Sequence, residues 1–210
     1  MLNSRTAALL VAAVALVFCA VGVQAQTVQF DFSRVYAGDT PTGAPPWATL
    51  VLETQGGGIV KGTLTNKMPS GSDQYITHLW LNTASNPAGI VLLPPVDPQL
   101  ATFQVGEDAF EANGSWFDVR IGFKKLPSQD RVMPGDTAVF YVKRTGLTAN
   151  EFNTAAVGGS GLYSLVHIAG TPGGYGYSRA TLVPEPGSLG LLALGAVPLF
   201  FVRFRRRRAA

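Results

Sequence analysis

The chain has 210 residues, of which 47% are hydrophobic and only 14% are charged, and it contains 24 Gly and 14 Pro. This composition excludes a charged disordered chain, and the frequent Gly and Pro disfavour a helical bundle and favour short strands joined by turns. The formal charge of +3 arises at the two ends, because residues 26–182 contain 10 Lys+Arg and 12 Asp+Glu, a net charge of −2. We therefore expect no nucleic-acid partner for this central region.

The first 25 residues have the layout of a secretory signal peptide. A short polar start with Arg5 precedes an apolar stretch at residues 7–21, and Val23-Gln24-Ala25 ends the segment with a small-x-small pattern. The apolar stretch is shorter than the roughly 20 residues that a membrane-spanning helix normally needs. We therefore expect a cleaved signal peptide rather than an N-terminal membrane anchor. Signal peptidase should cleave between Ala25 and Gln26.

The last 28 residues combine three features in a fixed order. A Pro-bounded joint at residues 183–186 leads into an apolar segment at residues 187–202, and the Arg-rich tail at residues 203–210 follows. The apolar segment would form a helix of about 24 Å, which can cross a hydrocarbon core of roughly 30 Å if the arginines extend towards the interface. The positive-inside rule then predicts a transmembrane helix with its arginines in the cytoplasm and residues 26–182 outside.

This order of joint, span and cations resembles the PEP-CTERM sorting signal of exported bacterial proteins. The resemblance implies recognition by an exosortase, an integral membrane protein of transpeptidase type, in bacteria that usually also make exopolysaccharide. It implies a form anchored in the inner membrane before processing, and then a location at the cell surface or outside the cell. The recognition triplet would be Pro184, Glu185 and Pro186, and the stop signal would be Arg203, Arg205, Arg206, Arg207 and Arg208.

Residues 26–182 are long enough for one self-sufficient domain, and alternation with a period of two is their clearest signal. Every second residue is apolar at 27–33, and again at 117–124. Other strand candidates lie at 49–54, 59–66, 75–82, 137–144 and 162–169, with shorter ones at 90–93, 103–105 and 178–183. Turn signals between them favour antiparallel pairing, which predicts an all-β domain: a β-sandwich of jelly-roll or immunoglobulin-like type, with a closed barrel as the alternative.

The alternation also predicts which side chains are buried and where helix is scarce. The expected core comprises Phe30, Phe32, Leu50, Leu52, Leu64, Trp80, Val119, Ile121, Phe140 and Val142. A capping box at Thr148-Ala149-Asn150-Glu151 predicts one or two helical turns that end near Asn153. Residues 107–112 are a second short helix candidate.

Four stretches inside this region also resemble the extracellular domain found in many PEP-CTERM proteins. They are residues 62–66, 76–82, 134–140 and 146–152. The family domain carries no established catalytic residues, so the resemblance implies none here.

No set of residues that would support catalysis can be assembled from the sequence. Cys19, the only cysteine, would leave with the signal peptide, and His78 and His167 each stand alone on a strand candidate. The closest carboxylates, Glu107, Asp108 and Glu111, suit either charges at a helix start or a calcium site, but no Asp-x-Asp spacing supports calcium. We expect no catalytic residue, no metal and no cofactor.

Aromatic residues in loops are the remaining signal of function. Trp47, Trp116, Tyr175 and Tyr177 lie in or beside Pro- and Gly-rich stretches, where exposed rings could stack on sugar faces, although core burial is the alternative for the tryptophans. Two function classes stay open. The first is a non-catalytic surface or matrix protein associated with exopolysaccharide or biofilm, and the second is a secreted carbohydrate-active or other hydrolytic enzyme with the same sorting tail.

Overall fold

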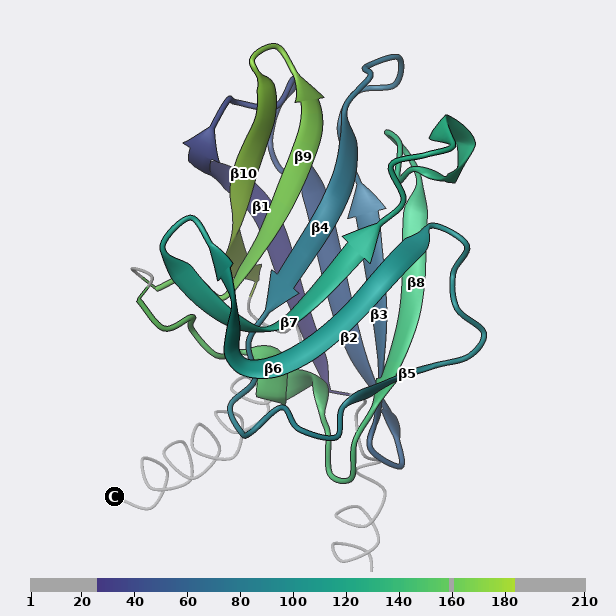
Figure 1. Ribbon diagram of the computed structural model, residues 1–210, viewed down its shortest axis with the longest axis vertical. Helices are drawn as coiled ribbons and strands as arrows, with labels where there is room; N and C mark the ends of the chain where they lie inside the picture. Colours follow the sequence, from purple (N-terminus) through teal and green to yellow (C-terminus); the bar gives the residue numbers. More distant parts are fainter. Residues whose placement is uncertain (1–25, 159–160, 184–210) are drawn as a thin grey trace, which may run out of the picture.

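The computed structural model describes residues 26–158 and 161–183, and the regular secondary structure of this part of the chain is almost entirely strand (Figure 1). The short 3₁₀ turns η1 (Ser128–Asp130) and η2 (Ala149–Phe152) are its helical elements. The prediction of an all-β, antiparallel domain is therefore confirmed. The strands are β1 (Thr27–Gly38), β2 (Ala48–Gly56), β3 (Ile59–Asn66), β4 (Tyr75–Leu81), β5 (Val91–Leu93), β6 (Leu100–Ala112), β7 (Ser115–Phe123), β8 (Thr137–Lys143), β9 (Ser164–Thr171) and β10 (Gly174–Val183).

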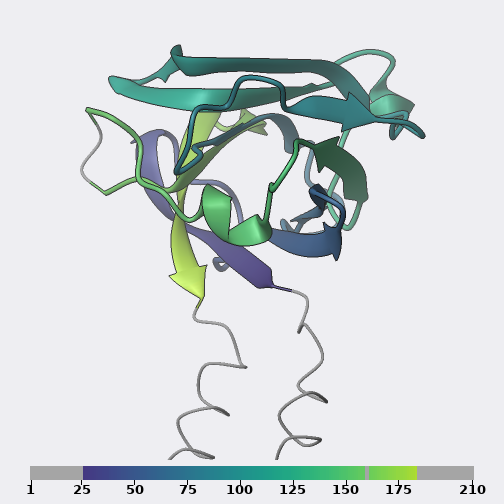
Figure 2. The same cartoon turned by 90° about the horizontal axis from the view of Figure 1, so that it is seen from below.

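All ten strands belong to one continuous sheet with the order β5-β8-β3-β2-β1-β10-β9-β4-β7-β6. The sheet is strongly curved, so that β6 and β7 lie across the interior from β1 and β2 (Figure 2). The two separate sheets expected of a sandwich are thus replaced by a single, nearly closed sheet. Hydrogen bonding continues through the central pair β1 and β10, which join the two halves of the curve.

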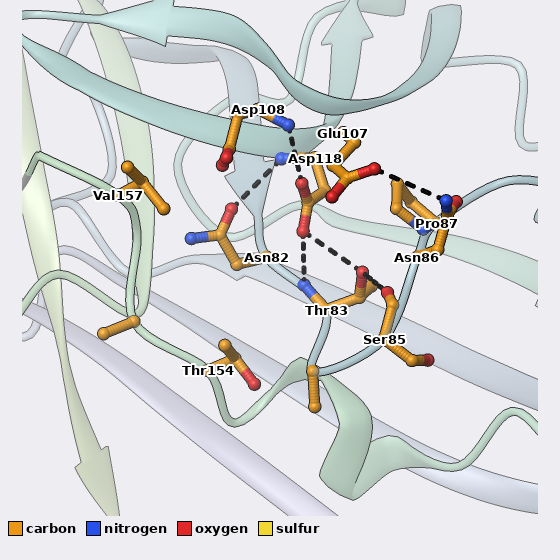
Figure 3. Close-up of a pocket in the computed structure, with 12 residues that line it drawn as sticks. Asn82, Thr83, Ser85, Asn86, Pro87, Glu107, Asp108, Asp118, Thr154 and Val157 are labelled. Atoms are coloured by element: carbon orange, nitrogen blue, oxygen red, sulfur yellow. Dashed lines mark hydrogen bonds between the residues drawn. The ribbon is translucent and has the colours of Figure 1, made fainter.

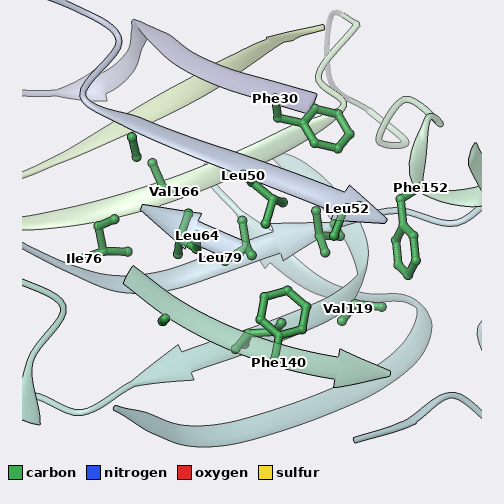
Figure 4. Packing of buried hydrophobic residues seen from close by; sticks show 14 of the residues in the cluster. Phe30, Leu50, Leu52, Leu64, Ile76, Leu79, Val119, Phe140, Phe152 and Val166 are labelled. Carbon is green, nitrogen blue, oxygen red and sulfur yellow. The ribbon is translucent and has the colours of Figure 1, made fainter. Parts of the chain in front are cut away.

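The concave face of the sheet encloses the main hydrophobic core (Figure 4). All ten side chains predicted from the alternation are buried, and Phe30, Phe32 and Leu50 have no exposed surface. Each fully buried Leu or Phe contributes roughly 1.5–3 kcal/mol, so this face accounts for most of the stabilisation. A smaller cluster around Trp80, Phe117 and Leu165 lies apart from the main core.

The two helix predictions have different outcomes. Residues Ala149–Phe152 form a 3₁₀ turn, but Thr148 makes no side-chain cap, and the Ala149 amide instead donates to Thr54 Oγ1 at 2.9 Å. The prediction of a helix at residues 107–112 is wrong, because this segment belongs to β6 and pairs with β7. Long-range pairing in the β6–β7 hairpin outweighs the local charge pattern there. No helix in the described ranges is long and apolar enough to cross a membrane.

The predicted signal peptide, including Ala25, lies outside the described residues. The predicted transmembrane helix, the recognition triplet and the arginines of the tail also lie outside them. The described chain begins at Gln26 and continues to Val183. Its first and last strands are neighbours, and Gln29 pairs with Val183.

Candidate ligand-binding site

The four aromatic residues expected to bind a ligand lie in three different places. Trp47 is only 4% exposed and packs in the main core, with its Nε1 donating to the Gly43 carbonyl at 3.0 Å, so of the two alternatives for this ring the structure shows core burial. The Pro-rich loop before it turns the ring inward. Trp116 is 43% exposed on β7, where its amide donates to the Val157 carbonyl. Tyr175 and Tyr177 lie together on β10.

The two tyrosines belong to a larger group on the convex side of the sheet, which we call the aromatic strip: His78, Trp80, His167, Tyr175 and Tyr177. The neighbouring strands β4, β9 and β10 supply these residues. His78 is in register with His167, and His167 is in register with Tyr177, so three rings lie in a row across three strands. The fold thus joins the two histidines that stand alone in the sequence.

Ring contacts run through the whole strip. The His167 and Tyr175 rings stack at 5.5 Å between centroids with an angle of 29°, and Tyr177 meets His167 edge-on at 4.7 Å. Trp80 lies 5.2 Å from His78 and 5.9 Å from Tyr177, and its burial of 96% makes it the floor of the strip. Tyr175 is the most accessible member, with 53% of its surface exposed, whereas His78, His167 and Tyr177 are half-buried.

One buried hydroxyl orients both imidazoles. Thr77 Oγ1, on a residue that is 1% exposed, lies 2.5 Å from His167 Nδ1 and 3.1 Å from His78 Nδ1. A hydroxyl carries a single proton, so at least one of the two Nδ1 atoms must donate to it. In its neutral form, that histidine has an unprotonated Nε2 free to accept a hydrogen bond.

The strip is uncharged at neutral pH. Burial, together with the positive charge of Lys125, lowers the pKa of His167 to about 4. Burial, then Lys125, His167 and Arg120, lower the pKa of His78 to about 4 as well. Burial raises the pKa of Tyr177, helped by Tyr175 and Glu111.

A glycine and a polar pair border the strip on the β7 side. Gly122 is in register with His78, and a Cβ there would come within 2.4 Å of Thr102 Oγ1 and 3.6 Å of His78 Cδ2. The missing side chain therefore leaves room for the Thr102 hydroxyl, while the contact with His78 would be an ordinary van der Waals contact. Arg120, in register with Trp80, donates from Nε to Gln104 Oε1 at 2.9 Å. Hydrogen-bonding groups thus lie next to the aromatic surface.

The three carboxylates singled out in the sequence lie in two different places. Within the described ranges, no group of three or more His, Cys, Asp or Glu side chains could hold a metal ion. Glu111 lies at the turn of the β6–β7 hairpin and accepts from the Gly114 amide, whereas Glu107 and Asp108 line a separate cavity.

Sequence reasoning found Tyr175 and Tyr177 but missed their partners on β4 and β9. One sequence signal could have indicated the two histidines. Each lies on a strand with apolar residues on the core face, and each histidine is on the other face. Pairing them requires the register of β4 against β9, which is shifted by an irregularity between Ile76 and His78.

Comparison with known proteins gives one match. Residues 182–208 match the PEP-CTERM protein-sorting motif, a segment that begins within β10 and covers the triplet and the arginines. No curated protein and no solved structure matches the chain significantly. The identification therefore depends on the C-terminal segment, the part of the chain where the sequence analysis expects a sorting signal. The chain is a PEP-CTERM motif-containing protein, and this motif implies export and processing by an exosortase.

Proposed function

We propose that this protein is exported, sorted by an exosortase and displayed at the cell surface or in the extracellular matrix, where its β domain binds polysaccharide without catalysing a reaction. The sorting motif at residues 182–208 supports the route of export. The observation that carries the binding role is the aromatic strip, with Tyr175 exposed above the stacked ring of His167.

The chemistry of the strip suits a sugar. Aromatic rings pack against the apolar faces of sugar rings, while polar groups at their edges bond the hydroxyls. The uncharged imidazoles offer both kinds of contact, since at least one has a free nitrogen acceptor, and Arg120 and Gln104 lie beside them. Because both histidine pKa values are about 4, we expect this surface to bind neutral polysaccharides equally well between pH 6 and pH 8.

The burial of Thr77 supports a non-catalytic role. A hydroxyl 2.5 Å from an imidazole nitrogen has the spacing of a nucleophile and its base. Thr77 is 1% exposed, however, so a substrate cannot reach its oxygen. Both Nδ1 atoms face that hydroxyl, and neither imidazole is hydrogen-bonded to a carboxylate in the described part of the chain.

Affinity gel electrophoresis tests the binding role. The full-length protein, in mild detergent, is run through native gels containing hydroxyethyl cellulose, xylan or galactomannan. We expect retardation in at least one gel and its loss in Tyr175→Ala, with roughly tenfold weaker binding because stacking and buried area are both lost. Tyr141→Ala, on the distant strand β8, is the matched control and should be retarded like the wild type.

Retardation that is equal in Tyr175→Ala and wild type would show that the strip is not the binding surface. An assay for new reducing ends on the same polysaccharides tests the absence of catalysis. Turnover that disappears in His167→Gln would overturn the non-catalytic assignment.

Sorting is tested by changing Pro184, Glu185 and Pro186 to alanine in a host that has an exosortase. The apolar span is untouched, so we expect normal insertion but no processing, with a full-length form that accumulates in the inner membrane. Fractionation and intact mass measure this. Processing and delivery equal to the wild type would contradict recognition of the triplet.

A further inference from the structure

A second site lies at the end of β4, away from the strip residues on β9 and β10. It is a cavity of about 180 Å³, with room for about six water molecules. Asn82 and Thr83 reach it from the end of β4, Glu107 and Asp108 from β6, and Asp118 from β7, and residues 154–157 close the other side (Figure 3).

Asp118 anchors the floor of this cavity. It is 6% exposed, and its carboxylate accepts hydrogen bonds from the Asp108 amide at 2.9 Å and the Thr83 amide at 2.9 Å. The Thr83 hydroxyl lies 3.1 Å from the same carboxylate. That hydroxyl has one proton and also contacts the Ser85 carbonyl at 2.7 Å, so the two backbone amides are the donors that hold Asp118 as a structural carboxylate.

Asn82 directs an unused donor into the cavity. The residue is 2% exposed, and its Oδ1 accepts from the Asp118 amide at 3.0 Å. That bond fixes the orientation of the side-chain amide, because the backbone N–H requires an oxygen acceptor. The Nδ2 group then points into the space beside Val157 and Thr154, and it has no hydrogen-bond partner in the described ranges (Figure 3). The Nδ2 group is open to the cavity, so a ligand that enters can place an acceptor against it.

The cavity also carries excess negative charge. The carboxylate of Asp108 makes no hydrogen bond within the described part of the chain, and that of Glu107 makes only a long contact of 3.4 Å with Asn86 Nδ2. No Lys or Arg is among the residues that line the cavity. Arg144, which contacts Ser85 Oγ at 2.7 Å, is paired with Glu151 at 2.8 Å. A ligand that enters would therefore be favoured by a positive charge.

An exposed ring lies near this site, outside the residues that line it. Trp116 precedes Asp118 by two positions on β7, so the two side chains leave the strand on the same face. The Trp116 ring lies beside Gly158, which follows the lining residue Val157. A ligand that extends out of the cavity could therefore reach this ring.

We propose that this cavity binds a sugar residue that carries a free ammonium group, as in a deacetylated amino-sugar polymer. The ammonium would pair with the carboxylates of Asp108 and Glu107, and a hydroxyl or ring oxygen would accept from Asn82 Nδ2. A neighbouring sugar of the polymer, outside the cavity, would lie against Trp116. A bare metal ion does not fit, because a nitrogen donor points into the cavity and cannot coordinate a cation. A simple polyamine would leave Asn82 and Trp116 unused.

The test is calorimetric titration of the full-length protein, in detergent at pH 6, with the glucosamine tetramer, the N-acetylglucosamine tetramer and spermidine. We expect the glucosamine tetramer to bind at least tenfold more tightly than the other two, with an affinity that falls as salt rises from 50 to 500 mM. Asp108→Asn keeps the shape and tolerates the positive φ of 45° at this position, so it should bind the two tetramers to within threefold of each other. Asp73→Asn, at the other end of β4, removes the same charge outside the cavity and should behave as the wild type.

Equal binding of the two tetramers, no binding, or an unchanged preference in Asp108→Asn would overturn the proposal. Spermidine binding as tightly as the glucosamine tetramer would show a general cation site and overturn the sugar assignment. The cavity and the aromatic strip are tested separately, because Tyr175→Ala should leave glucosamine binding intact.

Discussion

His78 and His167 are paired in register across β4 and β9, with their ring centroids 6.1 Å apart and the same buried hydroxyl bonded to both. Each imidazole has lost enough solvent that its charged form is disfavoured. Folding therefore lowers the pKa of both histidines on this surface, so their protonation differs between the folded and the unfolded chain.

This pairing predicts that the protein loses stability in mild acid. The pKa of each histidine is 6.5 in the unfolded chain and about 4 in the folded one, so between these values the unfolded chain binds more protons. The free energy of unfolding should therefore fall as the pH decreases from 6.5 to 4, by on the order of 1 kcal/mol for each histidine after discounting solvent screening. Thermal unfolding of the wild type and of a His78→Gln, His167→Gln variant measures the difference.

The variant should lose less stability than the wild type over this pH interval, because glutamine takes up no proton. Equal losses in the two proteins would show that the imidazoles ionise normally in the folded state.

Gly62 should not tolerate a methyl group. A Cβ at this position would lie between 2.1 and 2.7 Å from three ring atoms of Phe140, which is 1% exposed and cannot move away. We expect Gly62→Ala to lower the free energy of unfolding by about 1–3 kcal/mol in denaturant titrations. Combining it with Phe140→Leu should cost less than the sum of the two single changes, because the ring that causes the clash is gone. Strict additivity would contradict this contact.

Export should remove the first 25 residues. Val23 and Ala25 fit the small-residue requirement of signal peptidase, so we expect Gln26 at the N-terminus of the exported protein. Intact mass and N-terminal sequencing measure this. Material at the cell surface that retains Met1 would contradict the export route.

The arginine cluster should fix the orientation of the tail. Replacing Arg205, Arg206, Arg207 and Arg208 with glutamine removes the charges that, by the positive-inside rule, would hold this end in the cytoplasm, while the apolar sequence at residues 187–202 is unchanged. We expect a tag at the C-terminus to become accessible to protease from outside in a large fraction of the molecules. Substituting lysines instead retains the charge and should preserve the orientation, whereas a protected glutamine variant would argue against the role of charge.

Sequence alone could predict the strands and the core because both depend on local alternation. Leu50, Leu52 and Leu64 point to the core in the structure as the period of two requires. The prediction of a helix at residues 107–112 is wrong because their acidic charges are typical of a helix N-terminus. Pairing with β7, which lies outside this local segment, makes them part of a strand. Curvature into one sheet likewise depends on pairing between β1 and β10, which lie at opposite ends of the chain.

The candidate sites could be predicted only in part, for the same reason. Tyr175 and Tyr177 were found because they are adjacent on one strand, whereas His167 joins them through a register that no local pattern shows. Exposure and core burial both stay open for Trp47 in the sequence because a ring after two prolines can turn either way, and its burial depends on strands far along the chain. The unused amide of Asn82 becomes visible only once Asp118 is seen to bond its oxygen.

The central position of β10 has a consequence for the time course of export. This strand lies between β1 and β9, and the sorting motif begins at Leu182, so the first two residues of the motif belong to the sheet. Under the proposed export route, a chain that crosses a membrane from its N-terminus closes this sheet only after Leu182 and Val183 have crossed. The proposed exosortase would then meet a domain whose central strand carries the start of its signal.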